Sequence, residues 1–249
     1  MRIYLAGARP CGNGDEFTEI IRAEHPFLLD SFYYMNATTV EQIPYMGSFM
    51  LDSGAFTFIQ NSHGREIVWE EYIDRYAEFV KKQKIGLYLE LDIDAVVGYP
   101  KVKLLRKRLE YLVGWQCIPV WHKSRGIDEY KRMCQEYPYV AIGGYVIKEL
   151  TPKEYDNFPA MINYAHQYGA KVHGLGYTAL RNLTRHRFDS VDSTTWLCGN
   201  RFGYYCWFDG KTIVKKFKPD GMRVADAKRC GLHNFKEWIK FQKYADVHL

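Results

Sequence analysis

The chain has 249 residues, 47% of them hydrophobic and 25% charged, with a formal net charge of +5 at pH 7. This composition is typical of a globular protein with a sizeable core, and the absence of any apolar run of about 18 residues excludes a membrane-spanning helix. The mild positive charge permits a polyanionic partner without requiring one. The N-terminal residues lack the apolar stretch of a signal peptide, and the 6 cysteines are scattered, so we expect reduced thiols in a cytoplasmic protein.

Short apolar runs rich in β-branched or aromatic residues recur along the chain and predict strands. They cover residues 2–7, 27–35, 48–54, 86–92, 116–122, 139–145, 171–176 and 188–193. Amphipathic patterns between them predict helices, although the helix after the second strand is expected to be short or absent. The predicted helices cover residues 68–83, 101–113, 128–137 and 153–169, with Pro159 limiting the last.

This alternation of strands and helices predicts a parallel sheet, and the strand count favours a (β/α)8 TIM-type barrel. A doubly wound open sheet is the alternative fold. No repeat or linker is apparent, so residues 1–249 are expected to form a single catalytic barrel domain. Within it, residues from about 197 to 249 are predicted to form a short extension, with a hairpin and a terminal helix over 235–245 packed on the barrel.

Polar residues or glycines stand at the carboxyl end of one predicted strand after another. They are Asp52, Asp92 with Asp94, His122, Gly143 with Gly144, Gly174 with Gly176, and Asp192. A single aspartate at such a place commonly caps the next helix. A whole ring of them predicts a ligand site, because buried carboxylates are costly to desolvate and barrel active sites form at this end.

The predicted fourth strand, YLELDID, contributes several acids of its own. Side chains alternate along a strand, which places Glu90, Asp92 and Asp94 on one face and Leu89 and Leu91 on the other. We expect the apolar face to meet the helices and the acids to point into the barrel. Glu90 would then lie deepest, where it is a candidate for an ion pair.

Five motifs in chain order resemble those of the tRNA-guanine transglycosylase superfamily, whose fold is a (β/α)8 barrel. They are LDSGAF (51–56), LELDID (89–94), GGYVIKE (143–149), HGLGYT (173–178) and FDSVDSTTW (188–196). The DSTTW segment and the compact barrel look most like the phage and bacterial branch, which places 7-deazaguanine derivatives into DNA and so evades restriction nucleases. The resemblance implies a pentosyltransferase that exchanges guanine for a base such as preQ0 and needs no cofactor for its chemistry.

The resemblance also implies the catalytic residues. A carboxylate attacks C1′ of a guanosine and displaces guanine, and the incoming base then attacks the same carbon. Asp192 matches the nucleophile through the D-x-x-D-S spacing of the archaeal members, whereas a direct match of FDS selects Asp189. Asp52 takes the acid/base role, and small residues after it, Ser53 included, leave room for a flat base.

Base recognition follows from the same resemblance. Asp92 accepts hydrogen bonds from N1–H and the exocyclic amine of guanine. The Gly143-Gly144 backbone supplies amides to the base carbonyl or the 7-substituent, and Tyr145 occupies the place of a family leucine. The remaining candidates are His122, which either bonds the base or is a satisfied strand-end histidine, and Phe56, which either sandwiches the base or packs in the core.

Three basic clusters are candidates for phosphate contacts, at 104–108, 181–187 and 213–218, although solvated helix faces carry similar charges. The second, with Arg181, Arg185 and Arg187, is favoured because it directly precedes the predicted nucleophile strand. The target guanine must leave its stack, so the substrate is expected to be single-stranded or flipped.

The family's structural zinc uses a C-x-C-x-x-C spacing that this chain lacks. Its four candidate ligands here are Cys198, Cys206, Cys230 and His233, and Cys198-x7-Cys206 is not a zinc-knuckle spacing. Three alternatives to the DNA enzyme remain. They are a tRNA-guanine transglycosylase, a non-catalytic barrel subunit that binds nucleic acid or a partner, and a glycoside hydrolase with two carboxylates.

Overall fold

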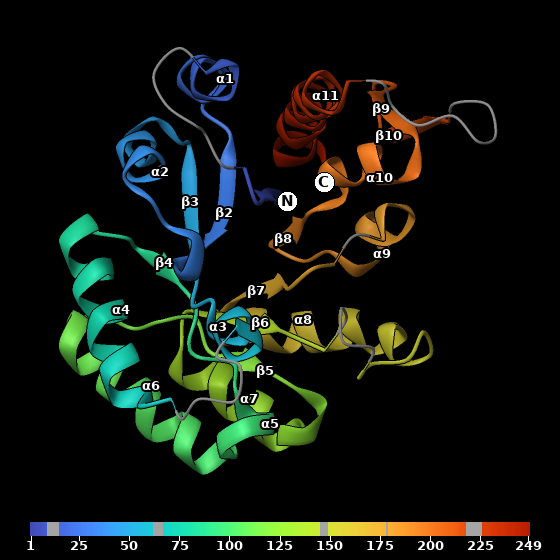
Figure 1. The fold of residues 1–249 in the computed structure, drawn as a ribbon. Helices are drawn as coiled ribbons and strands as arrows, with labels where there is room; N and C mark the ends of the chain where they lie inside the picture. Colours follow the sequence, from blue (N-terminus) through green and yellow to red (C-terminus); the bar gives the residue numbers. More distant parts are fainter. Residues whose placement is uncertain (9–14, 62–66, 145–148, 178, 218–225) are drawn as a thin grey trace.

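Parallel strands form one curled sheet with helices around it. The computed structural model describes residues 1–8, 15–61, 67–144, 149–177, 179–217 and 226–249 (Figure 1). The 8-stranded sheet has the order β4-β3-β2-β1-β8-β7-β6-β5. Its strands are β1 (Arg2–Ala6), β2 (Phe27–Ser31), β3 (Ser48–Asp52), β4 (Leu87–Tyr88), β5 (Val120–Trp121), β6 (Tyr139–Ile142), β7 (Lys171–Gly174) and β8 (Ser190–Ser193).

The two end strands of this sheet meet just after the last residue of β4 and just before the first residue of β5. An isolated parallel bridge joins Leu89 to Ile118. The Ile118 amide donates to the Tyr88 carbonyl at 2.8 Å, and the Glu90 amide donates to the Ile118 carbonyl at 3.1 Å. The curled parallel sheet with its surrounding helices is compatible with the predicted (β/α)8 barrel.

The helices follow the strands in alternation. Those outside the C-terminal region are α1 (Glu16–Glu24), η1 (Phe32–Tyr34), α2 (Ala37–Gln42), η2 (Ile43–Tyr45), α3 (Ala55–Asn61), α4 (Trp69–Gln83), α5 (Asp94–Val97), α6 (Tyr99–Val113), η3 (Lys123–Arg125), α7 (Ile127–Glu136), η4 (Glu154–Asn157), α8 (Phe158–Gln167), η5 (Leu180–Asn182) and α9 (Leu183–His186). The predicted helices at 68–83, 101–113 and 128–137 are confirmed within two residues. Helix α2 after the second strand is short, as expected, and Pro159 lies in the first turn of α8, where a missing N–H does no harm.

Two apolar layers hold the sheet. Inside the curl, Tyr4, Leu29 and Met50 pack with other buried side chains of the strands. Outside, Leu51 packs against the buried faces of α4 and α6, which also contact each other. Neighbouring residues of β3 therefore face opposite layers, as the period of a strand requires. The next inward-facing residue after Met50 is Asp52.

The predicted orientation of the fourth strand is confirmed for Leu91, Asp92 and Asp94 but was wrong for Leu89 and Glu90. Leu89 lies inside with Met50, whereas Leu91 packs with the α4 and α6 side chains. Glu90 contacts Arg106 of α6 rather than the inside of the curl. The strict alternation fails because β4 has only 2 residues and the chain leaves the ladder after Leu89.

The C-terminal region adds η6 (Thr195–Cys198), α10 (Gly199–Phe202), a hairpin of β9 (Tyr204–Phe208) and β10 (Ile213–Phe217), and α11 (Ala227–His248). The predicted hairpin is present, and the terminal helix is longer than 235–245. Helix α11 lies beside β1 (Figure 1), with the N-terminal amine donating to the Ala245 carbonyl at 3.0 Å. No helix within the described ranges is long and apolar enough to cross a membrane.

Candidate active site

A cavity of about 800 Å³ opens at the carboxyl ends of the strands. Asp52 ends β3, Asp192 lies in β8, and Asp92 follows β4; all three line this one cavity. The other lining residues are Leu29, Asp94, Ala95, Tyr99, His122, Ser124, Arg125, Gly143, Gly144, Glu149, Leu175 and Gly176. The expected convergence of three distant aspartates on one hollow is therefore present, and their chemical roles stay predictions.

The turn after Asp52 fixes its carboxylate. Asp52 Oδ1 accepts the Gly54 amide at 2.7 Å. Gly54 has φ +69° and a Cβ there would lie 2.3 Å from Ser31 Oγ, so this position requires glycine. Ser53 is buried and its carbonyl accepts the Tyr72 hydroxyl at 2.5 Å. Ser53 does not line the cavity, so its predicted contact with the base is not supported.

Asp52 has an environment suited to proton transfer. Burial raises its pKa, the Gly54 amide partly opposes this, and the nearby charges of Asp92, Asp192 and Asp30 raise it further, to about 6. A carboxyl with this pKa exchanges its proton near neutral pH, as a general acid and base must. Asp92 and Asp192 therefore lie close enough across the cavity for their charges to act on Asp52.

Only one oxygen of the Asp192 carboxylate, Oδ1, has partners among the described residues. Its Oδ1 accepts the Gly176 amide at 2.5 Å and lies 3.3 Å from His173 Nε2. Its Oδ2 has no partner within the described residues. The side chain is 11% exposed and faces the cavity, so the second oxygen is presented to whatever occupies that space.

A chain of buried hydrogen bonds supports Asp192 from below. His173 Nδ1 lies 2.5 Å from Ser190 Oγ, which lies 2.5 Å from the Tyr139 hydroxyl. His173 is fully buried in β7, next to β8. Because both imidazole nitrogens are engaged, the ring orientation is fixed and the Asp192 carboxylate is oriented with it. His173 lies in the HGLGYT motif, but its sequence context alone predicted no role for it.

His122 stands between two carboxylates. Its Nε2 lies 2.6 Å from Asp92 Oδ1 and its Nδ1 lies 2.8 Å from Glu149 Oε2. Burial lowers the pKa of His122, but the contacts with Asp92 and Glu149 outweigh it and raise the pKa to about 9. The ring is thus an imidazolium at neutral pH. Its Nδ1 is hydrogen-bonded to Glu149, and its Nε2 is in ion-pair contact with Asp92 without hydrogen-bond geometry. His122 contacts Asp92 and Glu149, which favours the second of its two predicted alternatives, a strand-end histidine satisfied by protein partners.

Glu149 was missed as a site residue, although it ends the GGYVIKE motif. Its Oε1 accepts the Ser124 amide at 2.8 Å, and its Oε2 meets His122. Burial raises the pKa of Glu149, but the Ser124 amide and His122 together keep it below the ordinary value. The side chain is therefore a carboxylate that fixes the far side of the imidazolium.

Gly143 and Gly144 line the cavity beside His122. A Cβ on Gly143 would lie 2.7 Å from His122 Cε1, so a side chain there would displace the ring. The Gly143 amide donates to the Trp121 carbonyl at 2.8 Å and is not free for a ligand, contrary to the prediction. The Gly144 amide has no partner in the described part of the chain. Only Gly144 of the pair is therefore able to donate to a bound base.

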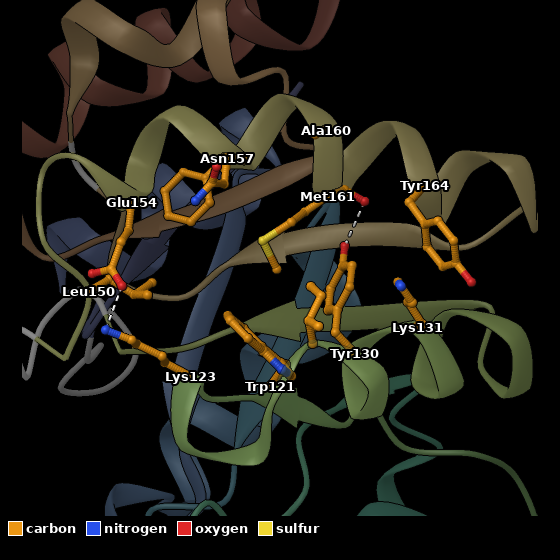
Figure 2. A pocket seen from close by; sticks show the side chains of 12 residues that line it. Trp121, Lys123, Tyr130, Lys131, Leu150, Glu154, Asn157, Ala160, Met161 and Tyr164 are labelled. Carbon is orange, nitrogen blue, oxygen red and sulfur yellow. Dashed lines mark hydrogen bonds and ion pairs between the residues drawn. The ribbon is translucent and has the colours of Figure 1, made fainter.

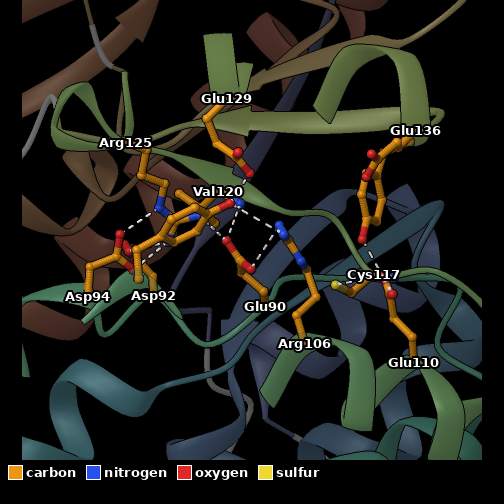
Figure 3. A network of polar contacts seen from close by, with 12 residues as sticks. Glu90, Asp92, Asp94, Arg106, Glu110, Cys117, Val120, Arg125, Glu129 and Glu136 are labelled. Atoms are coloured by element: carbon orange, nitrogen blue, oxygen red, sulfur yellow. Dashed lines mark hydrogen bonds and ion pairs between the residues drawn. The ribbon is translucent and has the colours of Figure 1, made fainter. Parts of the chain in front are cut away.

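A buried ion network underlies the cavity wall. Figure 3 shows Arg125 reaching both Glu90 and Asp94. Its NH1 lies 2.6 Å from Glu90 Oε1, its NH2 lies 2.5 Å from Asp94 Oδ1, and its side chain is 0% exposed. Arg106 approaches the other oxygen of Glu90 at 3.3 Å. Glu90 forms the structural ion pair that the sequence suggested. Arg125, which was not predicted, links Glu90 to Asp94 at the rim of the cavity.

The alternative nucleophile does not reach the cavity. Asp189 precedes the first residue of β8, and its Oδ2 accepts the Val172 amide at 2.7 Å and meets His166 Nε2 at 2.9 Å. The cavity lies at the other end of that strand, beside Asp192. The placement of Asp189 as a second nucleophile candidate is therefore wrong for this cavity.

The three arginines that were predicted to contact phosphates lie in the segment between β7 and β8, and they differ in exposure and in position. Arg181 is exposed in η5. Arg185 is exposed but pairs with Asp156 at 2.8 Å. Arg187 lies between α9 and the first residue of β8. It is therefore near the amino end of β8, whereas the cavity lies at the carboxyl end. The side chain of Phe56 and the whole of Tyr145 lie outside the described residues.

The four candidate zinc ligands serve local packing and hydrogen bonds instead. His233 Nε2 meets the Cys206 carbonyl at 2.9 Å, and Cys230 Sγ points to the Tyr204 carbonyl at 3.5 Å. Cys198 Sγ contacts the Thr194 carbonyl at 3.7 Å. Within the described ranges, no group of three or more histidines, cysteines or acids is arranged to hold a metal ion.

A second cavity, of about 500 Å³, lies between α7 and α8 on the outside of the sheet (Figure 2). Its walls are largely apolar and aromatic, including Trp121, Tyr130 and Met161. Its acid, Glu154, is paired with Lys123 at 2.5 Å. It therefore lacks the converging free carboxylates of the first cavity, and we place the candidate active site in the first.

No protein-family model matches this chain, and no curated protein sequence matches it. The choice of chemistry therefore depends on the arrangement of side chains in the cavity.

Proposed function

We propose that this protein is a base-exchange transglycosylase that replaces guanine in DNA with a 7-deazaguanine derivative through a covalent glycosyl-aspartate. The observation that carries the proposal is the meeting of Asp52, Asp92 and Asp192 around one cavity. A closed (β/α)8 barrel is part of the proposal, and the Leu89–Ile118 bridge between the end strands supports it.

Asp192 is the nucleophile in this mechanism. Its Oδ2 attacks C1′ of the target nucleoside, the C1′–N9 bond breaks, and the electron pair of that bond leaves on guanine. The amide of Gly176 on Oδ1 orients the carboxylate without occupying the attacking oxygen. Splitting one substitution into two in this way lowers the barrier of each.

Asp52 moves the proton in both halves of the reaction. With its pKa raised to about 6 by burial and the neighbouring acids, it protonates the departing guanine and then accepts the N9 proton of the incoming base. The deprotonated N9 attacks C1′ and releases Asp192 as a free carboxylate. Two displacements at one carbon retain its configuration.

Asp92 selects the base. Its side chain is 38% exposed toward the cavity, its Oδ1 is oriented by His122, and its Oδ2 has no partner within the described residues. A carboxylate so placed accepts N1–H and the exocyclic amine of guanine or a 7-deazaguanine side by side. The Gly144 amide donates to a carbonyl of the same base. A cavity this rich in carboxylates suits a base with several N–H donors.

The choice of DNA over tRNA comes from the resemblance of the DSTTW segment and the compact barrel to the DNA-modifying branch. A tRNA-guanine transglycosylase is the second candidate, because the same cavity serves either polymer. A non-catalytic subunit is disfavoured, since a binding scaffold has no need of two acids, Asp52 and Asp192, that line the same cavity.

The proposal is tested by base exchange. The purified protein is incubated with radiolabelled guanine and, in parallel, double-stranded DNA, single-stranded DNA and tRNA, and label in the polymer is counted. We expect incorporation into DNA that an unlabelled 7-deazaguanine such as preQ0 reduces. Exchange into tRNA alone would move the function to the second candidate, and no exchange into any polymer would refute it.

A further inference from the structure

The outer strand of the C-terminal hairpin is exposed along almost its whole length. In β10 only Ile213 is buried, and each residue from Val214 to Phe217 is exposed. The hairpin stands beside α11, away from the helices that cover the sheet (Figure 1). We call Val214–Phe217, with Trp207 of β9, the β10 ridge.

The open end of the hairpin is hydrogen-bonded to the chain just after β8, the strand that carries Asp192. Tyr204, at the open end of the hairpin, donates its hydroxyl to the Thr195 carbonyl at 3.2 Å. Thr195 follows closely on Ser193, the last residue of β8. Phe217 pairs with Tyr204 across the hairpin, and Lys215 Nζ lies 4.5 Å from the Tyr204 ring centre. The ridge thus extends outward from the strand that carries Asp192.

The charge of the ridge is uncompensated. Within the described residues, no carboxylate lies within ion-pair distance of Lys215 or Lys216. The one acid between 204 and 217 is Asp209, whose carboxylate accepts the Lys211 and Thr212 amides of the turn at 2.9 and 2.8 Å. An elongated positive patch without its own acids attracts a polyanion.

Some basic residues elsewhere on the surface are paired with acids, whereas others, such as Lys103 over the Tyr99 ring, resemble the ridge lysines. On the covering helices, Arg108 pairs with Asp74 at 2.8 Å and Arg132 with Glu136 at 2.6 Å. Lys243 of α11 likewise pairs with Glu24 at 2.6 Å. Such pairs neutralise a solvated helix face. The ridge lysines instead lie over aromatic rings, which leaves their positive charge open to a ligand.

The aromatic residues of the ridge supply flat surfaces between the charges. Phe217 is 68% exposed and Trp207 is 40% exposed. Lys216 Nζ lies 4.6 Å from the Trp207 ring centre. Side chains alternate along β10, so Lys216 with Trp207 lie on one face of the hairpin and Lys215 with Phe217 on the other. Each face thus offers one cation for a phosphate and one exposed ring on which an unpaired base of a single strand stacks.

We infer that the β10 ridge binds a single-stranded segment of polynucleotide and leads one of its bases to the cavity. The inference adds a polynucleotide-binding surface to the proposed function. It depends on the proposed function only for the reason why the protein would bind the strand, which is to deliver a base for exchange. A base must leave its stack before C1′ becomes accessible, and a ridge that holds the flanking nucleotides unstacked lowers the free energy of that step.

Fluorescence anisotropy with a labelled single strand of about 16 nucleotides tests the inference. We expect the Lys215→Gln/Lys216→Gln variant to bind roughly tenfold more weakly at about 100 mM salt, with the slope of log affinity against log salt reduced by about 1.4. The charge-matched control is Lys81→Gln/Lys82→Gln in the last turn of α4, at the opposite end of the strands, and should bind as the unaltered protein does.

A second variant separates stacking from charge. Phe217→Ala should weaken binding by about fivefold or more with the salt slope unchanged, because stacking involves no counterion release. Circular dichroism and thermal unfolding confirm that each variant is folded. Binding by both variants equal to that of the unaltered protein would overturn the inference. The inference would also be overturned if the variants lost binding to phosphatidylserine vesicles but bound the oligonucleotide as the unaltered protein does, because the ridge would then bind a membrane surface.

The assay also distinguishes failure of the inference from failure of the proposed function. Loss of oligonucleotide binding by the ridge variants, in a protein that never exchanges bases, supports the ridge and refutes the transglycosylase. Base exchange by a protein whose ridge variants bind normally supports the transglycosylase and refutes the ridge.

Discussion

Replacing Asp52 with asparagine should make the protein more stable while abolishing base exchange. The change removes a charge from the cavity, and an asparagine Oδ1 still accepts the Gly54 amide that Asp52 accepts at 2.7 Å. The pKa of Asp52 is raised from 3.8 to about 6 by burial and by neighbouring carboxylates. The folded state therefore binds this proton more tightly than the unfolded chain does.

The sign and size of the effect follow from proton linkage. The free energy of unfolding of the unaltered protein falls as the pH rises from about 4 to about 6, because the folded state gives up its proton later than the unfolded chain. Each pKa unit corresponds to about 1.4 kcal/mol, so above pH 6 the ionised carboxyl costs the folded state up to about 3 kcal/mol. Because the group faces an open cavity, we expect Asp52→Asn to gain about 1 to 3 kcal/mol at pH 8 and less than about 1 kcal/mol at pH 4.

Urea unfolding followed by tryptophan fluorescence at both pH values measures this difference. Asp128→Asn is the control, because the Asp128 side chain is 96% exposed and should change stability by less than about 1 kcal/mol at either pH. A loss of stability in Asp52→Asn at pH 8, or a gain of equal size at both pH values, would refute the account of Asp52 as a buried acid under strain from its neighbours.

Three further outcomes are expected. Asp192→Asn should reduce base exchange by at least about a thousandfold without unfolding the protein. Asp189→Asn should leave the rate of exchange within about twofold of that of the unaltered protein. If the exchange assay gave the reverse order, Asp189 would be the nucleophile instead of Asp192. Arg125→Met should lower the free energy of unfolding by about 3 to 5 kcal/mol, because it leaves Glu90 buried beside one fewer cation; a loss under about 1 kcal/mol in urea unfolding would contradict this. Contacts with two carboxylates raise the pKa of His122 to about 9 against its burial, so the unaltered protein should lose stability relative to His122→Gln between about pH 6.5 and pH 9; parallel stability curves would contradict this.

The order of elements was predictable because it depends on local patterns. Alternating apolar runs marked the strands, and helical spacing marked α4, α6 and α7 almost to their ends. Strand lengths were overestimated because turn residues such as Gly143 continue an apolar run without continuing the ladder. Helix α1 was not predicted, although its residues EFTEIIRAE carry a buried face against α11.

The residues around the cavity were only partly predictable. Parallel strands bring their carboxyl ends to one rim, so Asp52 and Asp192 were expected to meet. The partners of His122 were not, because Glu149 lies beyond the sixth strand and no local pattern joins the two. The same is true of Arg125, which follows the fifth strand and reaches back to Glu90.

The fourth strand shows why local rules can fail. Period-two alternation placed Glu90, Asp92 and Asp94 together on an inward face. The chain leaves the ladder after Leu89, and Arg106 and Arg125 hold Glu90 outside while Asp92 and Asp94 turn toward the rim. A carboxylate at this buried position needs charged partners, and these come from residues distant in the sequence that a local pattern does not reveal.

The most direct test of the central claim is to capture the covalent glycosyl-enzyme. The protein is incubated with a labelled DNA strand, quenched by denaturation before a second base is added, digested, and analysed by mass spectrometry. The mechanism predicts a denaturation-resistant complex with the deoxyribose attached to Asp192, and its absence from Asp192→Asn. A protein that exchanges bases with no adduct, or with the adduct on another residue, would contradict the account.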